Sequence, residues 1–207
     1  MELLTSFFIG LGSSFAASYL LNLVGFFAKI TPPKLRKSFG REYKNQEKAI
    51  RAILRDSKSS DSIRVLSLKG DTFSSPGKSG ELHNLLLNGP TKQKYLISDP
   101  QNPYIEQRGK ELQNENLNIG VQNSIACFLE ASSKNSNIVL KLHKEIVRFR
   151  LIIFDNCLYL SFQSTNIAGR LSPMQRFEKS SSGYSALEAY FEDLWKRYEK
   201  VKAFVSK

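Results

Sequence analysis

RFRLIIFDNCLYLSFQ, the segment from Arg148 to Gln163, decides the fold of this chain. Its two halves are short runs of aliphatic and aromatic residues, which favour β-strands. Asn156 lies between the two runs and fits a tight turn. We therefore predict two adjacent strands, Arg148–Asp155 and Cys157–Gln163, that pair as a hairpin.

The sequence on both sides of this hairpin alternates between strand and helix patterns. Three further apolar runs predict strands over Ile63–Lys69, Lys94–Ser98 and Asn137–Leu142. Apolar spacing predicts helices over Arg41–Asp56, Glu81–Leu87, Pro103–Ala131 (with a break near Asn114–Gly120) and Ser185–Val205. Polar loops are expected over Asp71–Gly80 and around Pro173 and Gly183. From residue 61 the order β-α-β-α-β-β-β-α predicts an α/β fold, a mixed α/β sandwich with helices on the faces of the sheet.

The N-terminal segment has the pattern of a membrane anchor. From Leu3 to Ala28 the sequence contains no charged residue, and about 20 helical residues suffice to cross a hydrocarbon core. A cleaved signal peptide is the competing interpretation. It would favour a positively charged start and a shorter apolar run, whereas this chain begins with Glu2 and has no early lysine or arginine. We expect residues 1–30 to form a single-pass transmembrane helix in the lipid bilayer.

Much of the net charge of +11 lies directly behind this apolar segment. Residues 31–60 are expected to form a basic juxtamembrane linker and helix, and residues 61–207 the α/β domain. The positive-inside rule predicts an inner-membrane protein with its N-terminus outside and its domain in the cytoplasm. Charge concentrated in this way argues against a nucleic-acid partner, which favours charge spread over a folded face. The residues expected at the membrane surface are Lys29, Lys34, Arg36, Lys37 and Arg41.

Several familiar kinds of site lack their sequence patterns. Cys127 and Cys157 lie in apolar runs and form no C-x-x-C pair, and His83 and His143 are isolated from each other. The loop Gly70–Ser79 lacks the glycine spacing of a phosphate-binding loop. We predict neither a metal site nor a cofactor.

Arg148 and Arg150 are the sharper candidates for chemistry. Side chains alternate along a strand, so both guanidinium groups are expected on one face, ahead of apolar Ile152. Desolvated arginines need anionic partners, and their planar donor set suits phosphate. The sequence leaves two possibilities open. The partner is either an anionic ligand or a carboxylate of the chain, from Glu145, Glu178 or Asp155.

The same segment resembles the phospholipase D-type family, whose signature is His-x-Lys-x-x-x-x-Asp on such a strand. Asp155 matches the aspartate, Arg150 stands at the lysine position, and Arg148 stands at the position of the nucleophilic histidine. The Gly-Ser-x-Asn turn of the family would fall on residues 161–164, which do not match it. The resemblance covers roughly Ile63–Lys200 and implies one half of a phospholipase D-type domain, completed by a homodimer. Because arginine stays protonated and cannot attack phosphorus, it also implies binding without cleavage.

Three functions follow as alternatives. The leading one is a membrane-anchored, non-catalytic sensor or effector that binds a small phosphate-bearing ligand or a partner, in a context such as bacterial stress or phage-defence signalling. The second is a divergent membrane-tethered phosphodiesterase or nuclease that recruits His143. The third is an anchored adaptor without a ligand. The predicted ligand-binding residues are Arg148, Arg150 and Asp155, followed by His143 and Lys144.

Overall fold

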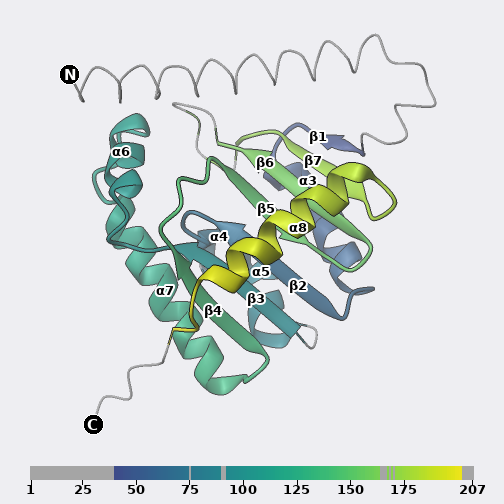
Figure 1. Cartoon of the computed structure of the whole chain (residues 1–207), viewed down its shortest axis with the longest axis horizontal. Helices are drawn as coiled ribbons and strands as arrows, with labels where there is room; N and C mark the ends of the chain where they lie inside the picture. The colour runs from purple at the N-terminus through teal and green to yellow at the C-terminus, as the bar shows by residue number, and fades with distance from the viewer. Residues whose placement is uncertain are drawn as a thin grey trace. The chain divides into compact units, whose positions relative to one another are not determined.

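The computed structural model describes residues 40–74, 76–89, 92–163, 167, 169 and 171–201. Their strands form one seven-stranded sheet in the order β1-β7-β6-β5-β2-β3-β4 (Figure 1). The strands are β1 (Glu42–Tyr43), β2 (Ser62–Ser67), β3 (Lys92–Ser98), β4 (Ile138–His143), β5 (Phe149–Ile153), β6 (Cys157–Phe162) and β7 (Met174–Glu178).

The helices of the described residues cover both faces of this sheet. They are α3 (Gln46–Ser57), α4 (Asp71–Ser74), α5 (Pro76–Asn88), α6 (Pro103–Glu111), α7 (Leu117–Lys134) and α8 (Ser182–Arg197). Figure 1 shows α8 lying across one face, with the other helices on the opposite side or at the edge. The predicted α/β architecture, a mixed sheet with helices on its faces, is therefore confirmed.

The sheet combines a parallel half and an antiparallel half. Strands β2, β3 and β4 are parallel to one another, whereas β5 runs antiparallel to β2 and pairs with β6 in the predicted hairpin. The hairpin turn is closed by the amide of Phe154, which donates to the carbonyl oxygen of Cys157 at 2.8 Å. As a result, the carboxyl ends of β2–β4 and the start of β5 meet at one edge of the sheet.

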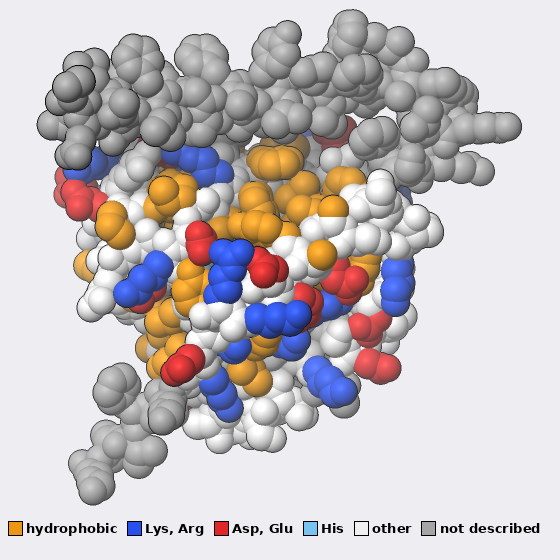
Figure 2. Space-filling view, viewed as in Figure 1, with side chains coloured by type: hydrophobic (Ala, Val, Ile, Leu, Met, Phe, Trp, Pro, Cys, Tyr) orange, Lys and Arg blue, Asp and Glu red, His pale blue; other side chains and the backbone are white. Residues whose placement is uncertain are grey.

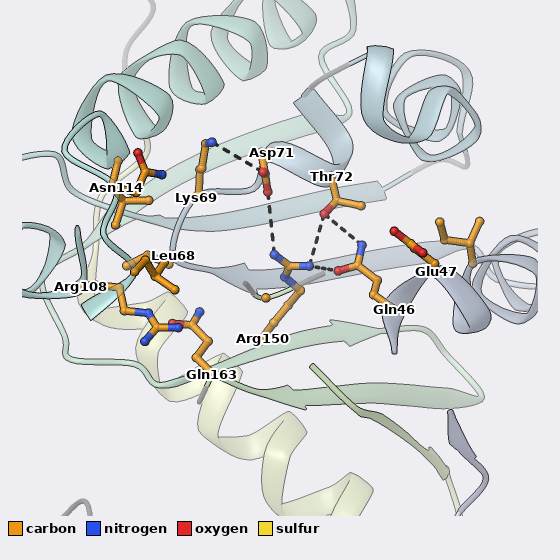
Figure 3. A pocket seen from close by; sticks show the side chains of 14 residues that line it. Gln46, Glu47, Leu68, Lys69, Asp71, Thr72, Arg108, Asn114, Arg150 and Gln163 are labelled. Atoms are coloured by element: carbon orange, nitrogen blue, oxygen red, sulfur yellow. Dashed lines mark hydrogen bonds and ion pairs between the residues drawn. The ribbon is translucent and has the colours of Figure 1, made fainter. Parts of the chain in front are cut away.

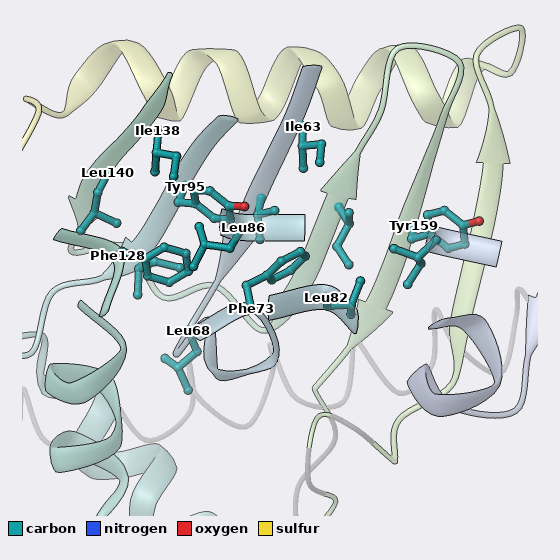
Figure 4. Packing of buried hydrophobic residues seen from close by; sticks show 14 of the residues in the cluster. Ile63, Leu68, Phe73, Leu82, Leu86, Tyr95, Phe128, Ile138, Leu140 and Tyr159 are labelled. Carbon is teal, nitrogen blue, oxygen red and sulfur yellow. The ribbon is translucent and has the colours of Figure 1, made fainter. Parts of the chain in front are cut away.

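Burial on both faces explains why the strands are almost continuously apolar. Along β5, Leu151 and Ile153 pack in a cluster with Phe191 and Leu194 of α8. Ile152 points the other way, into a larger cluster beneath α3–α7 that includes residues shown in Figure 4.

Ion pairs connect α8 to strands β2 and β3 of the sheet. The guanidinium of Arg64 on β2 donates to Glu188 at 2.7 Å and to Glu192 at 3.1 Å. Lys94 on β3 also pairs with Glu192, at 3.1 Å. Figure 2 shows this face, on which acidic and basic side chains are interspersed. The positive charge visible here is therefore neutralised locally and forms no continuous basic stripe on this view of the described residues.

Four segments differ from the sequence prediction. Glu42–Tyr43 forms β1, where the start of a helix was expected, and the last helix spans Ser182–Arg197 instead of Ser185–Val205. Met174–Glu178 forms strand β7, where a polar loop was expected, because it pairs with both β6 and β1. The stretch expected to be a loop over Asp71–Gly80 contains α4 and the start of α5. Strand pairing in β7 and burial of Phe73 in α4 overrode the loop-forming composition of these two segments.

The unit that contains the sheet spans Gly40–Lys207. Helix α3 contributes Ala49 and Ile53 to the larger core cluster, so it is an integral part of the domain. The backbone of Arg41 also belongs to the fold, because its carbonyl oxygen accepts a hydrogen bond of 2.8 Å from the amide of Arg176. The guanidinium of Arg41 lies over the ring of Tyr43.

The predicted transmembrane helix at Leu3–Ala28 lies outside the described residues, as do Lys29, Lys34, Arg36 and Lys37. Within the part of the chain that the structure describes, none of the helices combines the length and apolar character needed to cross a bilayer.

Candidate functional site

A cavity of about 340 Å³ opens at the edge where β2 ends and β5 begins. Its described lining contains three basic residues and two carboxylates, together with amide and aliphatic side chains (Figure 3). The basic residues are Lys69, Arg108 and Arg150, and the carboxylates are Glu47 and Asp71. The lining therefore carries a small excess of positive charge.

Arg150 and Arg108 are the two buried cations that line this cavity, and Arg108 is the more deeply buried of the two. It enters from β5, and its Nη1 donates to the side-chain oxygen of Gln46 and to Oγ1 of Thr72, the latter at 3.3 Å. Its Nη2 lies 3.9 Å from a carboxylate oxygen of Asp71. Burial lowers the pKa of Arg150 and Asp71 opposes that shift. An arginine nevertheless keeps its charge at neutral pH.

The turn after β2 places the next two charged groups at the cavity. Gly70 adopts a φ of 74°, a left-handed conformation that disfavours other residues, and this turn leads directly into α4. It brings the Nζ atom of Lys69 to 3.6 Å from a carboxylate oxygen of Asp71. Asp71 therefore lies between two cations, Lys69 and Arg150 (Figure 3).

Arg108 is a site residue that the sequence analysis missed. It lies on α6, its side chain is 1% exposed, and its Nη1 donates to Glu111 at 2.8 Å. The sequence does contain one indication that Arg108 is buried. It follows Tyr104 by four residues, so these two residues share a helix face. An arginine on the apolar face of a helix is a candidate for a paired or ligand-binding charge.

Arg148 and Arg150 project from the same side of the sheet, but the structure gives them separate partners. The Nη2 atom of Arg148 lies 3.0 Å from Glu111, and its guanidinium lies over the ring of Tyr104. The carboxylates that pair with the two arginines are thus Glu111 and Asp71. They differ from the three considered from the sequence, because they come from α6 and α4, far away along the chain.

Asp155 lies beyond the other end of β5, away from the arginines. Its carboxylate accepts hydrogen bonds from the hydroxyl of Ser60 at 2.9 Å, the amide of Asp61 at 2.7 Å, and both the amide and hydroxyl of Ser62. Burial acts to raise the pKa of Asp155, but these hydrogen bonds prevail and lower it. In this structure Asp155 organises the loop that leads into β2.

His143 and Lys144 also lie apart from the cavity lining. His143 is fully buried, its ring is 6.5 Å from that of Tyr198, and burial lowers its pKa to about 4. It alternates with Leu142, which packs toward the larger core, so it faces the α8 side of the sheet. Lys144 is exposed, with its Nζ 3.9 Å from Asp99.

The cavity provides donors for an anion and few groups for covalent chemistry. Among the described residues that line it, there is no histidine and no cysteine. Over the described part of the chain, no group of three or more His, Cys, Asp or Glu side chains is placed to hold a metal ion. The arrangement can therefore bind and orient an anion through fixed positive charge.

No family model and no curated protein matches this sequence. Among solved structures, the chain is similar to TrmBL2, an archaeal chromatin protein, with 14% identity and a TM-score of 0.48 over 92% of this chain. It spans 63% of the TrmBL2 chain. It is also similar to Nuc, a phospholipase D family member from Salmonella typhimurium, with 15% identity and a TM-score of 0.49 over 75% of this chain and 91% of Nuc. NucT from Helicobacter pylori shows 10% identity and a TM-score of 0.46 over 75% of this chain and 92% of NucT.

Proposed function

We propose that this domain binds a small phosphate-bearing anion in the cavity without cleaving it. The observation that carries this proposal is the placement of Arg150, which is 9% exposed and lines the same cavity as Lys69 and Arg108. The cavity volume of about 340 Å³ lies in the range of small-molecule sites. We further propose that the apolar segment Leu3–Ala28 anchors this binding domain to a membrane, which would make the protein a tethered sensor or effector.

The surroundings of Arg150 leave its charge only loosely compensated by the chain. The Nη2–Oδ1 separation of 3.9 Å from Asp71 is longer than a charge-assisted hydrogen bond, and Nη1 donates to the neutral groups of Gln46 and Thr72. Asp71 is also shared with Lys69. A phosphate group, with several acceptor oxygens, would complement these cations more fully.

Binding without cleavage is supported by the residue types at the cavity. Covalent phosphoryl transfer in the phospholipase D-type family requires a histidine, and Arg148 stands at that position in the resembling motif. His143 faces the side of the sheet covered by α8, so it would have to move from its buried position to act there. Phosphodiesterase activity that disappears in His143→Ala would overturn this part of the proposal.

A second candidate, an adaptor without a ligand, is favoured by one specific observation. Arg148 already pairs with Glu111, and Arg150 already contacts Gln46, Thr72 and Asp71. On this alternative, the buried charges serve only to connect α3, α4 and α6 to the sheet. The two candidates differ in whether the full-length chain binds anions at all.

Calorimetric titration of the full-length chain with inorganic phosphate and with adenosine monophosphate tests the proposal. Lys69→Met removes one cavity cation, and Lys110→Met removes an exposed lysine of α6 as a matched control. We expect Lys69→Met to weaken binding by about tenfold or more, the loss typical of a hydrogen bond to a charged group. We expect Lys110→Met to bind as the wild type does. Absence of binding to the wild type, or equal losses in both variants, would contradict the proposal.

Arg150→Lys is the second test variant, because it keeps a basic side chain and removes the planar donor set. Lysine offers a point charge instead of a planar fork, so phosphate affinity should fall although the domain still folds. Circular dichroism confirms the fold of each variant before titration. Unchanged affinity in a folded Arg150→Lys variant would place the ligand elsewhere.

A further inference from the structure

The carboxylate of Glu111 is held between two guanidinium groups. One oxygen lies 3.0 Å from Nη2 of Arg148, and the other lies 2.8 Å from Nη1 of Arg108. The Glu111 side chain is only 15% exposed. Burial acts to raise its pKa, but the two arginines prevail and keep the pKa below its ordinary value. Glu111 is therefore an anion fixed between two cations at neutral pH.

This arrangement uses the donors that a bound phosphate would use. Each guanidinium offers one N–H to a different oxygen of the same anionic group, as in recognition of a phosphate by two arginines. Arg108 lines the candidate cavity, and Arg148 stands two residues before Arg150 on the same side of the sheet. Glu111 thus occupies an anion position next to the cations of the proposed ligand site.

The segment that carries Glu111 is a helix end. Glu111 is the last residue of α6, and Gln113 follows in a turn with a φ of 51°. A non-glycine residue in this conformation carries strain of about 1–2 kcal/mol. Leu112 and Asn114 of the same turn line the cavity. A rearrangement of this turn could therefore move Glu111 while the preceding turns of α6 keep their hydrogen bonds.

We propose that Glu111 competes with the anionic ligand for Arg108 and Arg148. It thereby determines how strongly a ligand must interact with these arginines to be bound. This inference rests on the proposed function, because it assigns a regulatory residue to the same site. Ligand binding displaces the Glu111 carboxylate from Arg108 and Arg148 and opens the turn after α6. Weakly interacting anions fail to displace it, whereas a phosphate group with two negative charges succeeds.

The test is calorimetric titration of inorganic phosphate into full-length Glu111→Gln and Glu47→Gln. Both changes remove one negative charge close to the cavity, but only the first removes a charge that is paired with two guanidiniums, so Glu47→Gln is the matched control. We expect Glu111→Gln to bind phosphate at least about tenfold more tightly than the wild type, the change expected when a charge-assisted competitor is lost. Glu47→Gln should gain several-fold less. Equal gains in the two variants would show that net charge alone acts, which would overturn the proposal.

A double-mutant cycle identifies the cations involved. The gain in Glu111→Gln should largely disappear in Glu111→Gln/Arg148→Met, because Arg148 is one of the two groups that Glu111 occupies. An undiminished gain in the double variant would contradict the proposal.

Hydrogen exchange provides a measurement on the unmodified chain. Saturating phosphate should increase amide exchange at Leu112–Asn114 as the turn opens, because the amides of Leu112 and Asn114 donate to Arg108 and Gly109 in the closed state. Slower exchange there would overturn the displacement model. Phosphate binding that depends on Lys69 but not on Glu111 would refute this inference alone, whereas absence of phosphate binding would refute the proposed function.

Discussion

The Nη2 atom of Arg150, the second residue of β5, lies 3.9 Å from Oδ1 of Asp71, the first residue of α4. This pair connects the antiparallel half of the sheet to the turn that leaves the parallel half. Asp71 is 24% exposed whereas the Arg150 side chain is 10% exposed, so the cation is the more desolvated partner. The consequences of the cavity geometry can be tested through this pair and its neighbours.

Asp71→Asn should lower the free energy of unfolding by about 1–3 kcal/mol, because Arg150 loses its nearest carboxylate while it remains buried. Saturating phosphate should restore most of this loss by replacing the missing negative charge. Urea unfolding with and without phosphate measures both effects. Asp99→Asn is the control, since Asp99 pairs with Lys144 outside the cavity. A phosphate effect on Asp71→Asn no larger than that on the wild type would contradict the expectation.

Asp155→Asn should destabilise the domain by about 2 kcal/mol and leave phosphate affinity unchanged. The amide group can replace only one oxygen, so at least one donor of the Ser60–Ser62 loop loses its acceptor. Chemical denaturation gives the first quantity and calorimetry the second. Loss of phosphate binding in a folded Asp155→Asn variant would restore Asp155 as a ligand-binding residue.

His143 should make stability depend on pH between about 4 and 6.5. Burial lowers its pKa to about 4 in the folded chain, whereas an exposed histidine titrates near 6.5. The unfolded chain therefore binds the additional proton first as the pH falls, so the free energy of unfolding decreases through this window. The stabilisation is complete above about pH 6.5, and its loss on reaching pH 4 is about 3 kcal/mol.

Denaturation of the wild type and of His143→Leu at a series of pH values from 7 to 4.5 provides the check. Carboxylates with lowered pKa values, such as Asp56 and Asp155, lose their contributions mainly below this range. The variant should show a much smaller slope, whatever its stability at neutral pH. A slope equal to that of the wild type would mean that another group causes the acid sensitivity.

Gly70→Ala should lower stability by about 2–3 kcal/mol, because the site combines a left-handed backbone with close packing. The added Cβ would lie 2.8 Å from side-chain atoms of both Ile97 and Phe128. Gly120→Ala is the matched control in α7, where the added Cβ would meet only the flexible end of Lys69 among its nearest contacts. Thermal unfolding should show a large loss for the first variant and a change within about 1 kcal/mol for the second. Equal losses would contradict this account of Gly70.

The sequence predicted the central strands well because their burial on both faces requires apolar residues. The short apolar runs around Leu66, Leu96 and Leu151 match strands that are buried on both faces. Strand β7 was missed because Met174 and Phe177 are its only buried residues, which gives too weak an alternation to distinguish it from a loop. Strand β1 is too short for any periodic signal.

The site was only partly predictable for a related reason. Strand alternation correctly placed Arg148 and Arg150 on one side of the sheet. Their partners Glu111 and Asp71 come from helices whose positions depend on the complete topology, so no local pattern reveals them. Asp155 was assigned to the site through a linear motif, although it lies beyond the end of β5 and Arg150 lies near the start of that strand. This separation becomes apparent only when the ends of the strand are known. Asp155 holds the loop before β2 instead of a ligand.

The most direct test of anion binding is a crystal structure of the full-length chain grown in the presence of phosphate. We expect a phosphate ion within hydrogen-bonding distance of the Arg150 guanidinium and the Lys69 ammonium group, with Glu111 moved away from Arg148. A crystal grown at saturating phosphate would contradict this expectation if the cavity held no phosphate and Arg150 still contacted Asp71 and Gln46.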